Sequence, residues 1–431
     1  MRKGILKGIG AWTPRLKAGL DSLAIFYLRV LIRRVSWHFL QIIANSVGIC
    51  YTNEIMTQIP RILDLRPLVR EKSCFLFGPR QTGKTSLLRE QFPESTVIDL
   101  LDTEVFLRLQ ARPSLMREMT PKKGKVVLDE IQKIPELLNE VHLLIEKNRD
   151  IQFIMTGSSA RKLRQKGVNL LGGRARSRRL HPFVSAELKD QLSLNQALLY
   201  GSLPSIYFSD HPREDMKSYV SDYLREEIAI EAATRNLPAF SRFLETAALT
   251  NGQIINYQKI SNDAQVKRTT VQNYYELLRE TLIGSDLESF KKTKSRKATV
   301  SSKFYFFDLG IVNFLKGIRE IPERTSLFGE AFEAYMHHEL RSWVDYNGDA
   351  DLKYWRSPSG VHEVDFILNE EVAIECKSTR NVTQEDLKGL LALAAEAKFK
   401  RKVIVCFESH RRLISGVEVI PWKEFLEELW G

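Results

Sequence analysis

The sequence contains few cysteines. Cys50, Cys74, Cys376 and Cys406 are spread over 431 residues, and no two of them form a CxxC pair. This spacing excludes a zinc knuckle with ligands close in sequence and argues against a disulfide framework. Three of the four lie within apolar runs, where cysteine is usually a small core residue. The pattern predicts a reducing, cytoplasmic compartment.

A long apolar run is also lacking near the N-terminus. Residues 23–28 are apolar, but Arg29 ends the run, whereas a membrane span needs about 20 apolar residues. A signal peptide needs an unbroken apolar segment and a small-residue cleavage site, and neither is evident. We therefore expect no transmembrane segment.

Acidic residues are scarce in residues 1–55, which are basic throughout. Three interpretations stay open: a basic amphipathic helix on a membrane, a disordered basic arm, or an upstream extension outside the working protein. We favour the extension, because Met56 begins a stretch that leads directly into the strand pattern described below.

Over the whole chain, 64 Lys and Arg outnumber 53 Asp and Glu, which gives a formal charge of +11. Such a surface favours polyanions, including nucleic acid, nucleotide or an acidic membrane face. Much of this charge is expected on solvated helix faces, so it raises the expectation of a DNA partner only modestly.

Short apolar runs alternate with helical stretches between residues 71 and 188. The runs at 73–77, 95–100, 125–128 and 152–155 are typical of buried parallel strands, and residues 85–91, 104–110 and 134–147 are typical of helices. This alternation predicts an α/β fold with a parallel sheet covered on both faces.

Three domains are expected after the N-terminal extension. Residues 56–190 form the parallel-sheet domain, residues 191–320 a helical middle region, and residues 321–431 a small α/β domain. In the last of these we expect a helix over 328–346, two strands, a helix near 385–397 and a strand over 402–407.

A complete GxxxxGK(S/T) motif lies between the first strand and the first helix of the parallel-sheet domain. This context is the one a phosphate-binding loop needs, because backbone N–H groups and the helix N-terminus then face the phosphates. Lys84 is expected to reach the β- and γ-phosphates of ATP, and Thr85 to ligate Mg²⁺. The predicted binding residues are Gly78, Pro79, Arg80, Gln81, Thr82, Gly83, Lys84, Thr85 and Ser86.

Two acids end the next-but-one predicted strand. Asp129 is expected to hold the water shell of Mg²⁺, and Glu130 to polarise the attacking water. Thr156 ends another strand, where a hydroxyl would sense the γ-phosphate, although an ordinary turn fits nearly as well. Arg174 follows a glycine pair and suits an arginine finger on a neighbouring subunit. It belongs to a basic run at residues 174–179 that a solvated loop explains equally well.

The middle region contains a helix-turn-helix pattern at residues 257–260 and 267–274, followed by a Lys- and Ser-rich loop at 291–302 that suits a wing. The second helix would place Lys267 and Arg268 on phosphates, and Gln272 or Asn273 near base edges. A packing or partner-binding lid is an equally good interpretation.

The last domain contains a predicted β-hairpin, residues 363–368 and 372–377. Residues two apart share a strand face, so Glu375 and Lys377 point the same way, with Cys376 buried opposite, and Asp365 on the partner strand joins them. This is the Asp…Glu-x-Lys pattern of restriction-endonuclease-like folds. Asp365 and Glu375 would ligate Mg²⁺, Lys377 would orient or deprotonate water, and Glu333 would complete the site. A hairpin with exposed charges is the alternative.

Together these segments resemble bacterial and archaeal AAA-like ATPases that carry a C-terminal domain of unknown function. The resemblance covers residues 56–431 and rests on GPRQTGKT at Gly78, VVLDEIQKIPEL at Val126, TGSSA at Thr156, LGGR at Leu171, HPFVSAEL at His181, GSLP at Gly201, YLREEI at Tyr223 and PWKEFLEELW at Pro421. It implies ATP binding and hydrolysis, without a settled cellular role. Ser202 departs from the family pattern, in which GGLP is more usual.

The sequence thus favours an ATP-regulated enzyme acting on DNA, with ATP and Mg²⁺ as ligands. The alternative is a nucleotide-switched scaffold or sensor whose nuclease-like domain cuts nothing and whose partner is a protein or a second copy of the chain.

Overall fold

The computed structural model describes residues 59–159, 173–221, 223, 236–291, 301–348 and 350–431. The chain divides into two units, Met1–Ile59 and Pro60–Gly431, and all but one of the described residues belong to the second. The predicted extension at 1–55 therefore lies outside the described residues. So does most of the wing loop expected at 291–302.

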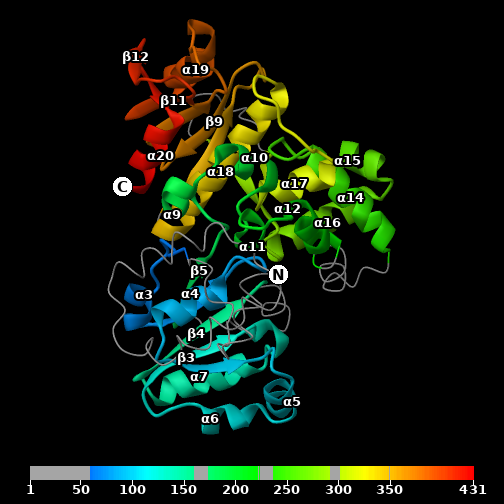
Figure 1. Cartoon of the computed structure of the whole chain (residues 1–431), viewed down its shortest axis with the longest axis vertical. Coiled ribbons are helices and arrows are strands. Elements are labelled where there is room, and N and C mark those ends of the chain that lie inside the picture. The colour runs from blue at the N-terminus through cyan, green and yellow to red at the C-terminus, as the bar shows by residue number, and fades with distance from the viewer. Residues whose placement is uncertain (1–58, 160–172, 222, 224–235, 292–300, 349) are drawn as a thin grey trace, which may run out of the picture. The chain divides into compact units, whose positions relative to one another are not determined.

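The first half of the second unit contains a five-stranded parallel sheet, as the sequence predicts (Figure 1). Its order is β2-β3-β4-β1-β5, and every neighbouring pair is parallel. The strands are β1 (Ser73–Phe77), β2 (Thr96–Asp99), β3 (Gly124–Asp129), β4 (Ile151–Gly157) and β5 (Ala175–Arg179).

Strand β5 differs from expectation. The basic run at 174–179 was expected as a finger or a solvated loop, and it instead pairs along the whole of β1 as an edge strand. Its sequence is Ala-Arg-Ser-Arg-Arg, with no buried side chain. An edge strand tolerates such charges, because only one side of its backbone must be paired.

Helices cover both faces of this sheet. They are α3 (Arg66–Glu71), α4 (Lys84–Gln91), α5 (Thr103–Ala111), α6 (Met116–Met119) and α7 (Leu137–Lys147). Because side chains alternate along a strand, Phe75 and Phe77 pack with α5 and α7, whereas Cys74 and Leu76 pack with α3 and α4. The P-loop region therefore begins at the end of a strand that is buried on both sides.

The middle region is mainly helical. It contains α9 (Ser185–Leu188), α10 (Leu194–Tyr200), α11 (Pro204–Tyr207), α12 (Pro212–Ser218), α14 (Leu237–Leu249), α15 (Tyr257–Ala264), α16 (Arg268–Glu280) and α17 (Leu309–Lys316). An antiparallel pair, β6 (Gly284–Ser289) and β7 (Lys303–Phe306), follows α16. An apolar cluster rich in Phe and Tyr, including Phe240, Phe243 and Tyr275, holds α14, α15 and α16 together.

The C-terminal region contains α18 (Ser326–Asn347), α19 (Lys388–Glu396), α20 (Trp422–Trp430), β8 (Leu352–Arg356), β9 (Glu363–Leu368), β10 (Val372–Cys376), β11 (Arg401–Cys406), β12 (Arg412–Ile414) and β13 (Val417–Pro421). Its strands join β6 and β7 in one eight-stranded sheet of order β12-β13-β11-β10-β9-β8-β6-β7. The hydrogen-bonded sheet therefore crosses the boundary predicted at residues 320 and 321.

The described cysteines and helices can be compared with the expectations from the sequence. Cys74, Cys376 and Cys406 are free thiols, and Cys376 is half-buried rather than fully buried as expected. None of the helices in the described ranges has the combined length and apolar character that crossing a bilayer requires.

Candidate nucleotide site

The loop between β1 and α4 adopts a conformation that depends on its glycines. Gly83, the N-cap of α4, has φ of 89°, and Gln81 has φ of 64°. A Cβ on Gly78 would lie 2.5 Å from the backbone oxygen of Leu180, closer than any side chain tolerates. Glycine is needed at 83 for the left-handed backbone and at 78 for the close approach of Leu180, which directly follows β5.

Lys84 points into this loop. Its side chain is buried, and its Nζ donates to the carbonyl oxygens of Gly78 at 2.8 Å and Pro79 at 3.0 Å. Burial lowers the pKa of Lys84, and the nearby Glu130 and Asp129 carboxylates oppose this effect. The ammonium group therefore sits at the centre of the loop, where a phosphate-binding lysine is needed.

Four of the predicted catalytic and metal-binding residues meet beside the loop. Thr85 Oγ1 donates to Asp129 Oδ2 at 2.8 Å, and Thr156 Oγ1 donates to Asp129 Oδ1. The backbone N–H of Glu130 donates to Thr156 Oγ1 at 3.0 Å. They converge because β3 lies beside β4, which lies beside β1, so their carboxyl ends share one edge of the sheet. A hydroxyl and a carboxylate are the oxygen ligands that Mg²⁺ prefers.

A residue that sequence reasoning missed holds Glu130. Gln132 is buried, and its Nε2 donates to Glu130 Oε2 and, at 3.1 Å, to Ser158 Oγ. A Cβ on Gly157 would lie 2.6 Å from Gln132 Oε1, so glycine at 157 leaves room for the amide. No spacing rule singles out Gln132. Its only signal is a polar residue shortly after the acidic pair.

The remaining loop residues contact the middle region or the loop itself. Thr82 Oγ1 donates to the Pro79 oxygen at 2.9 Å, and Gln81 Oε1 accepts from Ser205 Oγ at 2.6 Å. Arg80 lies over the Tyr223 ring, 5.5 Å from its centroid, and Ser86 is exposed on α4. The loop is thus positioned by α11 and the segment after α12 as well as by its own turn.

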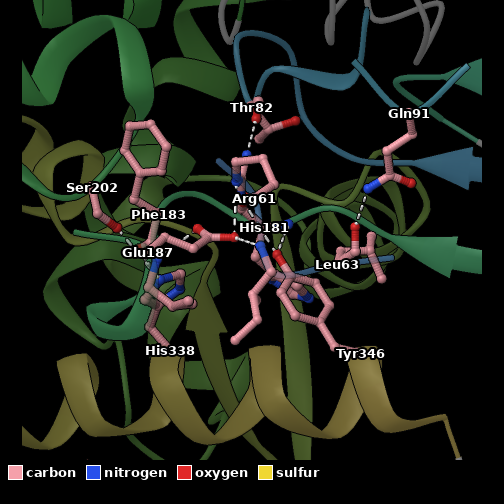
Figure 2. Close-up of polar contacts among 12 residues, drawn as sticks. Arg61, Leu63, Thr82, Gln91, His181, Phe183, Glu187, Ser202, His338 and Tyr346 are labelled. Atoms are coloured by element: carbon pink, nitrogen blue, oxygen red, sulfur yellow. Dashed lines mark hydrogen bonds and ion pairs between the residues drawn. The ribbon is translucent and has the colours of Figure 1, made fainter. Parts of the chain in front are cut away.

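Arg61, which the sequence did not single out, ties the loop to two distant segments (Figure 2). Its Nη1 donates to the Thr82 oxygen at 2.6 Å, its Nη2 to the His181 oxygen at 2.7 Å, and its Nε pairs with Glu187 at 2.9 Å. Tyr346 of α18 lies 3.5 Å from Nη2.

This ion pair is buried. The side chains of Arg61 and Glu187 are 5% and 0% exposed. Burial alone would lower the pKa of Arg61, but Glu187 and Tyr346 together outweigh this effect and leave the pKa raised. Arg61 therefore stays charged while it connects the P-loop to α9 and α18.

Arg174 does not join the nucleotide site of its own chain. Its neighbour Ala175 pairs with Ser73, at the opposite end of β1 from the P-loop, and its guanidinium pairs with Glu146 of α7. Only a nucleotide bound by another copy of the chain is left as a target for an arginine finger.

The C-terminal region contains a separate group of carboxylates, called the acid cluster here: Glu333, Glu363, Asp365 and Glu375. Lys377 Nζ lies 2.7 Å from Glu375 Oε1, and Asp365 Oδ2 accepts from the backbone N–H of Cys376 at 2.8 Å. Burial raises the pKa of Asp365 well above its usual value, and the Glu375 and Glu333 charges add to the effect. Burial also raises the pKa of Glu375.

All four predicted nuclease residues therefore lie near one another. The arrangement is nevertheless not that of a formed metal centre, since within the described ranges no three His, Cys, Asp or Glu side chains converge closely enough to hold an ion. Sequence reasoning missed Lys303, a buried lysine of β7 that enters the cluster.

Comparison with known proteins agrees with the P-loop geometry. The AAA domain family matches residues 70–189, which contain the loop and the acidic pair. Residues 70–189 form an AAA-like P-loop domain. Two further families, both described as domains of unknown function, match residues 191–321 and 328–425, so the AAA-like domain precedes both.

Two mycobacterial proteins described as uncharacterized resemble both the AAA-like domain and the regions after it. Rv2008c of Mycobacterium tuberculosis and Mb2031c of Mycobacterium bovis are each 25% identical over 375 residues, which span 84% of this chain and 82% of each relative.

Solved structures give fainter likenesses. The RuvB Holliday junction branch migration motor of Thermotoga maritima has a TM-score of 0.27 at 13% identity, covering 51% of this chain and 86% of that one. Can2 of Sulfobacillus thermosulfidooxidans, solved with cyclic tetra-adenylate, has a TM-score of 0.17 at 12% identity, covering 85% and 98%. These scores are too low to bear on function or partners.

Proposed function

We propose that this chain binds ATP with Mg²⁺ and hydrolyses it. The observation that carries the proposal is the 2.8 Å hydrogen bond between Thr85 Oγ1 and Asp129 Oδ2, beside a buried Lys84. This contact brings the motif at the start of α4 and the acid at the end of β3 to a single point. Two solvated acids or a chance glycine motif would not converge in this way.

Each residue has a distinct role in the proposed reaction. Lys84 neutralises phosphate charge, and Thr85 and Asp129 are the residues that would hold Mg²⁺, which would supply further charge neutralisation. Glu130 polarises the attacking water, and Gln132 orients the Glu130 carboxylate through its amide. Thr156 is bonded to Asp129 and to the Glu130 backbone, and these contacts support a role for it in sensing the γ-phosphate.

We further propose that nucleotide binding acts as a switch on the rest of the chain. Arg61 donates to the P-loop oxygen of Thr82 and approaches Tyr346 of α18. A movement of the loop would therefore be transmitted through Arg61 to α18 in the C-terminal region. Gln81 adds a second link, to Ser205 of α11. These contacts link the loop to both later regions, and together with the lack of a formed metal centre among the described acids they favour a nucleotide-switched scaffold over an enzyme that cuts DNA.

Phosphate release by the full chain tests the ATPase proposal. Turnover is expected with Mg²⁺ and none with EDTA, and Lys84→Ala is expected to lose nucleotide binding because the buried ammonium contributes the main phosphate contact. Plasmid DNA in the same reaction separates the two classes of function. DNA-stimulated turnover with nicking would favour the DNA enzyme, whereas an intact plasmid and unchanged turnover would favour the switch.

The Lys84→Ala variant has its own decisive outcome. ATP turnover at the wild-type rate by this variant would rule out the assigned nucleotide site.

DNA binding without cleavage is the second candidate function, and α16 favours it. Its buried stripe, which includes Val271 and Tyr275, packs on the middle region, whereas Lys267, Arg268, Gln272 and Asn273 are exposed near its N-terminus. Helices α15 and α16 followed by the β6–β7 pair fit a winged helix, whose second helix enters the major groove.

Removing two of these charges tests DNA binding. Lys267→Ala with Arg268→Ala is expected to weaken binding to any duplex. It should also reduce the slope of the logarithm of the binding constant against the logarithm of the salt concentration by about 2, because each substitution leaves one phosphate without its cation. Fluorescence anisotropy at several salt concentrations measures both quantities. Lys122→Ala with Lys123→Ala removes the same charge from an exposed turn of the AAA-like domain and serves as control. Equal effects of the two pairs would exclude a specific α16 interface.

Location and assembly are proposals of the same kind. The free thiols suit a cytoplasmic compartment. A homo-oligomer would give Arg174 a nucleotide to contact, since the loop of its own chain lies at the other end of β1.

A further inference from the structure

The acid cluster already contains a cation. Lys303 Nζ lies 2.6 Å from Glu363 Oε1 and 3.1 Å from Glu333 Oε1, and its side chain is only 5% exposed. Two carboxylates within ion-pair distance of a buried amine favour its ammonium form, so Lys303 is a charged group held inside the cluster.

This lysine comes from a different part of the chain than the acids. Lys303 lies on β7, where it pairs with Leu287 of β6, whereas the four carboxylates lie on α18, β9 and β10. Tyr305, two residues along β7, donates to the same Glu333 oxygen at 2.7 Å. Because β6 and β7 extend the C-terminal sheet, the middle region places two donors into the acid cluster.

The cluster still has unused acceptor capacity. Glu375 is buried, and its Oε2 has no hydrogen-bond partner. With all groups charged, carboxylates outnumber the two ammonium groups, Lys303 and Lys377. Oε1 of the same carboxylate is paired with Lys377, so one buried oxygen is left as an acceptor for an ion that replaces Lys303.

We propose that Lys303 occupies the place between Glu333 and Glu363, beside the buried Asp365, that a divalent cation would otherwise take. While Lys303 stays there, the C-terminal region holds no Mg²⁺ or Mn²⁺. Removing the ammonium group leaves Glu333 and Glu363 without their cation beside the buried Asp365, and these carboxylates can then turn toward a divalent ion. This inference is independent of the ATPase proposal, because it concerns no nucleotide.

Mn²⁺ binding to the full chain without nucleotide tests the inference. Calorimetry and thermal melting are expected to show no Mn²⁺ effect for the wild type. Lys303→Met should melt at a lower temperature, bind Mn²⁺ at least about tenfold more tightly than the wild type, and recover its melting temperature when Mn²⁺ is added. Adding Asp365→Asn to this variant should remove the gain, which places the ion in the acid cluster.

Lys316→Met is the matched control, since Lys316 pairs with Glu330 at 3.7 Å outside the cluster and should leave Mn²⁺ binding unchanged. Wild-type Mn²⁺ binding that Asp365→Asn abolishes would overturn the inference, as would Lys303→Met without a gain. If Lys303→Met does not fold, Lys303→Arg provides the test. Its retained charge should keep Mn²⁺ out, and Mn²⁺ binding to that variant would contradict the proposal.

Discussion

Glu130→Gln is expected to keep ATP bound while lowering kcat by about 10²–10⁴, the range for a lost general base. The amide keeps the size of the side chain and removes only its basicity. Affinity should survive because Lys84, Thr85 and Asp129 are untouched, and because the Glu130 backbone N–H still donates to Thr156. Single-turnover phosphate release and equilibrium binding of labelled ATP measure the two properties separately.

Glu94→Gln is the matched control for this substitution, since Glu94 is an exposed glutamate of the same domain. It should leave both kcat and affinity unchanged. Normal turnover by Glu130→Gln would show that another group polarises the water. Loss of ATP binding would instead show that Glu130 shapes the loop rather than the reaction.

Arg61→Ala is expected to destabilise the protein by about 3–5 kcal/mol, the usual cost of removing one partner of a buried ion pair. The substitution leaves the Glu187 carboxylate fully buried without its cation, and it removes the donors to the Thr82 and His181 oxygens. ATP affinity should also fall, because the loop loses its contact with Arg61. Each 1.4 kcal/mol of binding free energy lost in this way corresponds to about tenfold weaker binding. Denaturant unfolding with and without ATP measures both effects.

Two further variants separate packing from loop positioning. Arg61→Ala with Glu187→Gln removes the stranded charge, so it should regain stability but not ATP affinity, because the Thr82 contact is still missing. Arg66→Ala breaks an exposed pair with Asp64 and should change neither property noticeably. Full recovery of ATP affinity in the double variant would mean that Arg61 supports the fold only.

The parallel sheet could be predicted from sequence because its central strands are continuous apolar runs. The runs predicted at 73–77 and 125–128 correspond to β1 and β3, each within a residue at either end. Strand β5 escaped prediction because an edge strand bearing three arginines has no apolar signal. Helix α7 begins at Leu137 rather than at residue 134, since a short 3₁₀ turn at Ile131–Lys133 precedes it.

The candidate site divides in the same way. Residues carried by a local motif, such as Thr85, Asp129 and Glu130, could be named in advance, and the sheet brings them together. Arg61 and Lys303 could not, because their partners lie far away in sequence: Arg61 contacts residues 82, 181 and 187, and Lys303 contacts Glu333 and Glu363. Tertiary contacts of this kind leave no spacing pattern.

The domain limits predicted at 190 and 320 stay predictions, and the eight-stranded sheet shows why the second is hard to place. Composition changes near residue 320, but backbone pairing does not respect the change, since Glu288 pairs with Lys353 across it. Composition and periodicity along the sequence indicate local structure, whereas membership of a sheet depends on pairing between residues far apart in the sequence.

That pairing has a consequence for how the protein is made. Chains emerge from the ribosome N-terminus first, at about 5–20 residues per second. Strand β6 is therefore synthesised seconds before β8, the strand that pairs with its free edge. During this interval the hairpin of β6 and β7 presents unpaired N–H and C=O groups, and an open edge of this kind can recruit a strand from another nascent chain. Slowed translation between the two segments would lengthen that exposure and lower the yield of folded protein, even though no residue is changed.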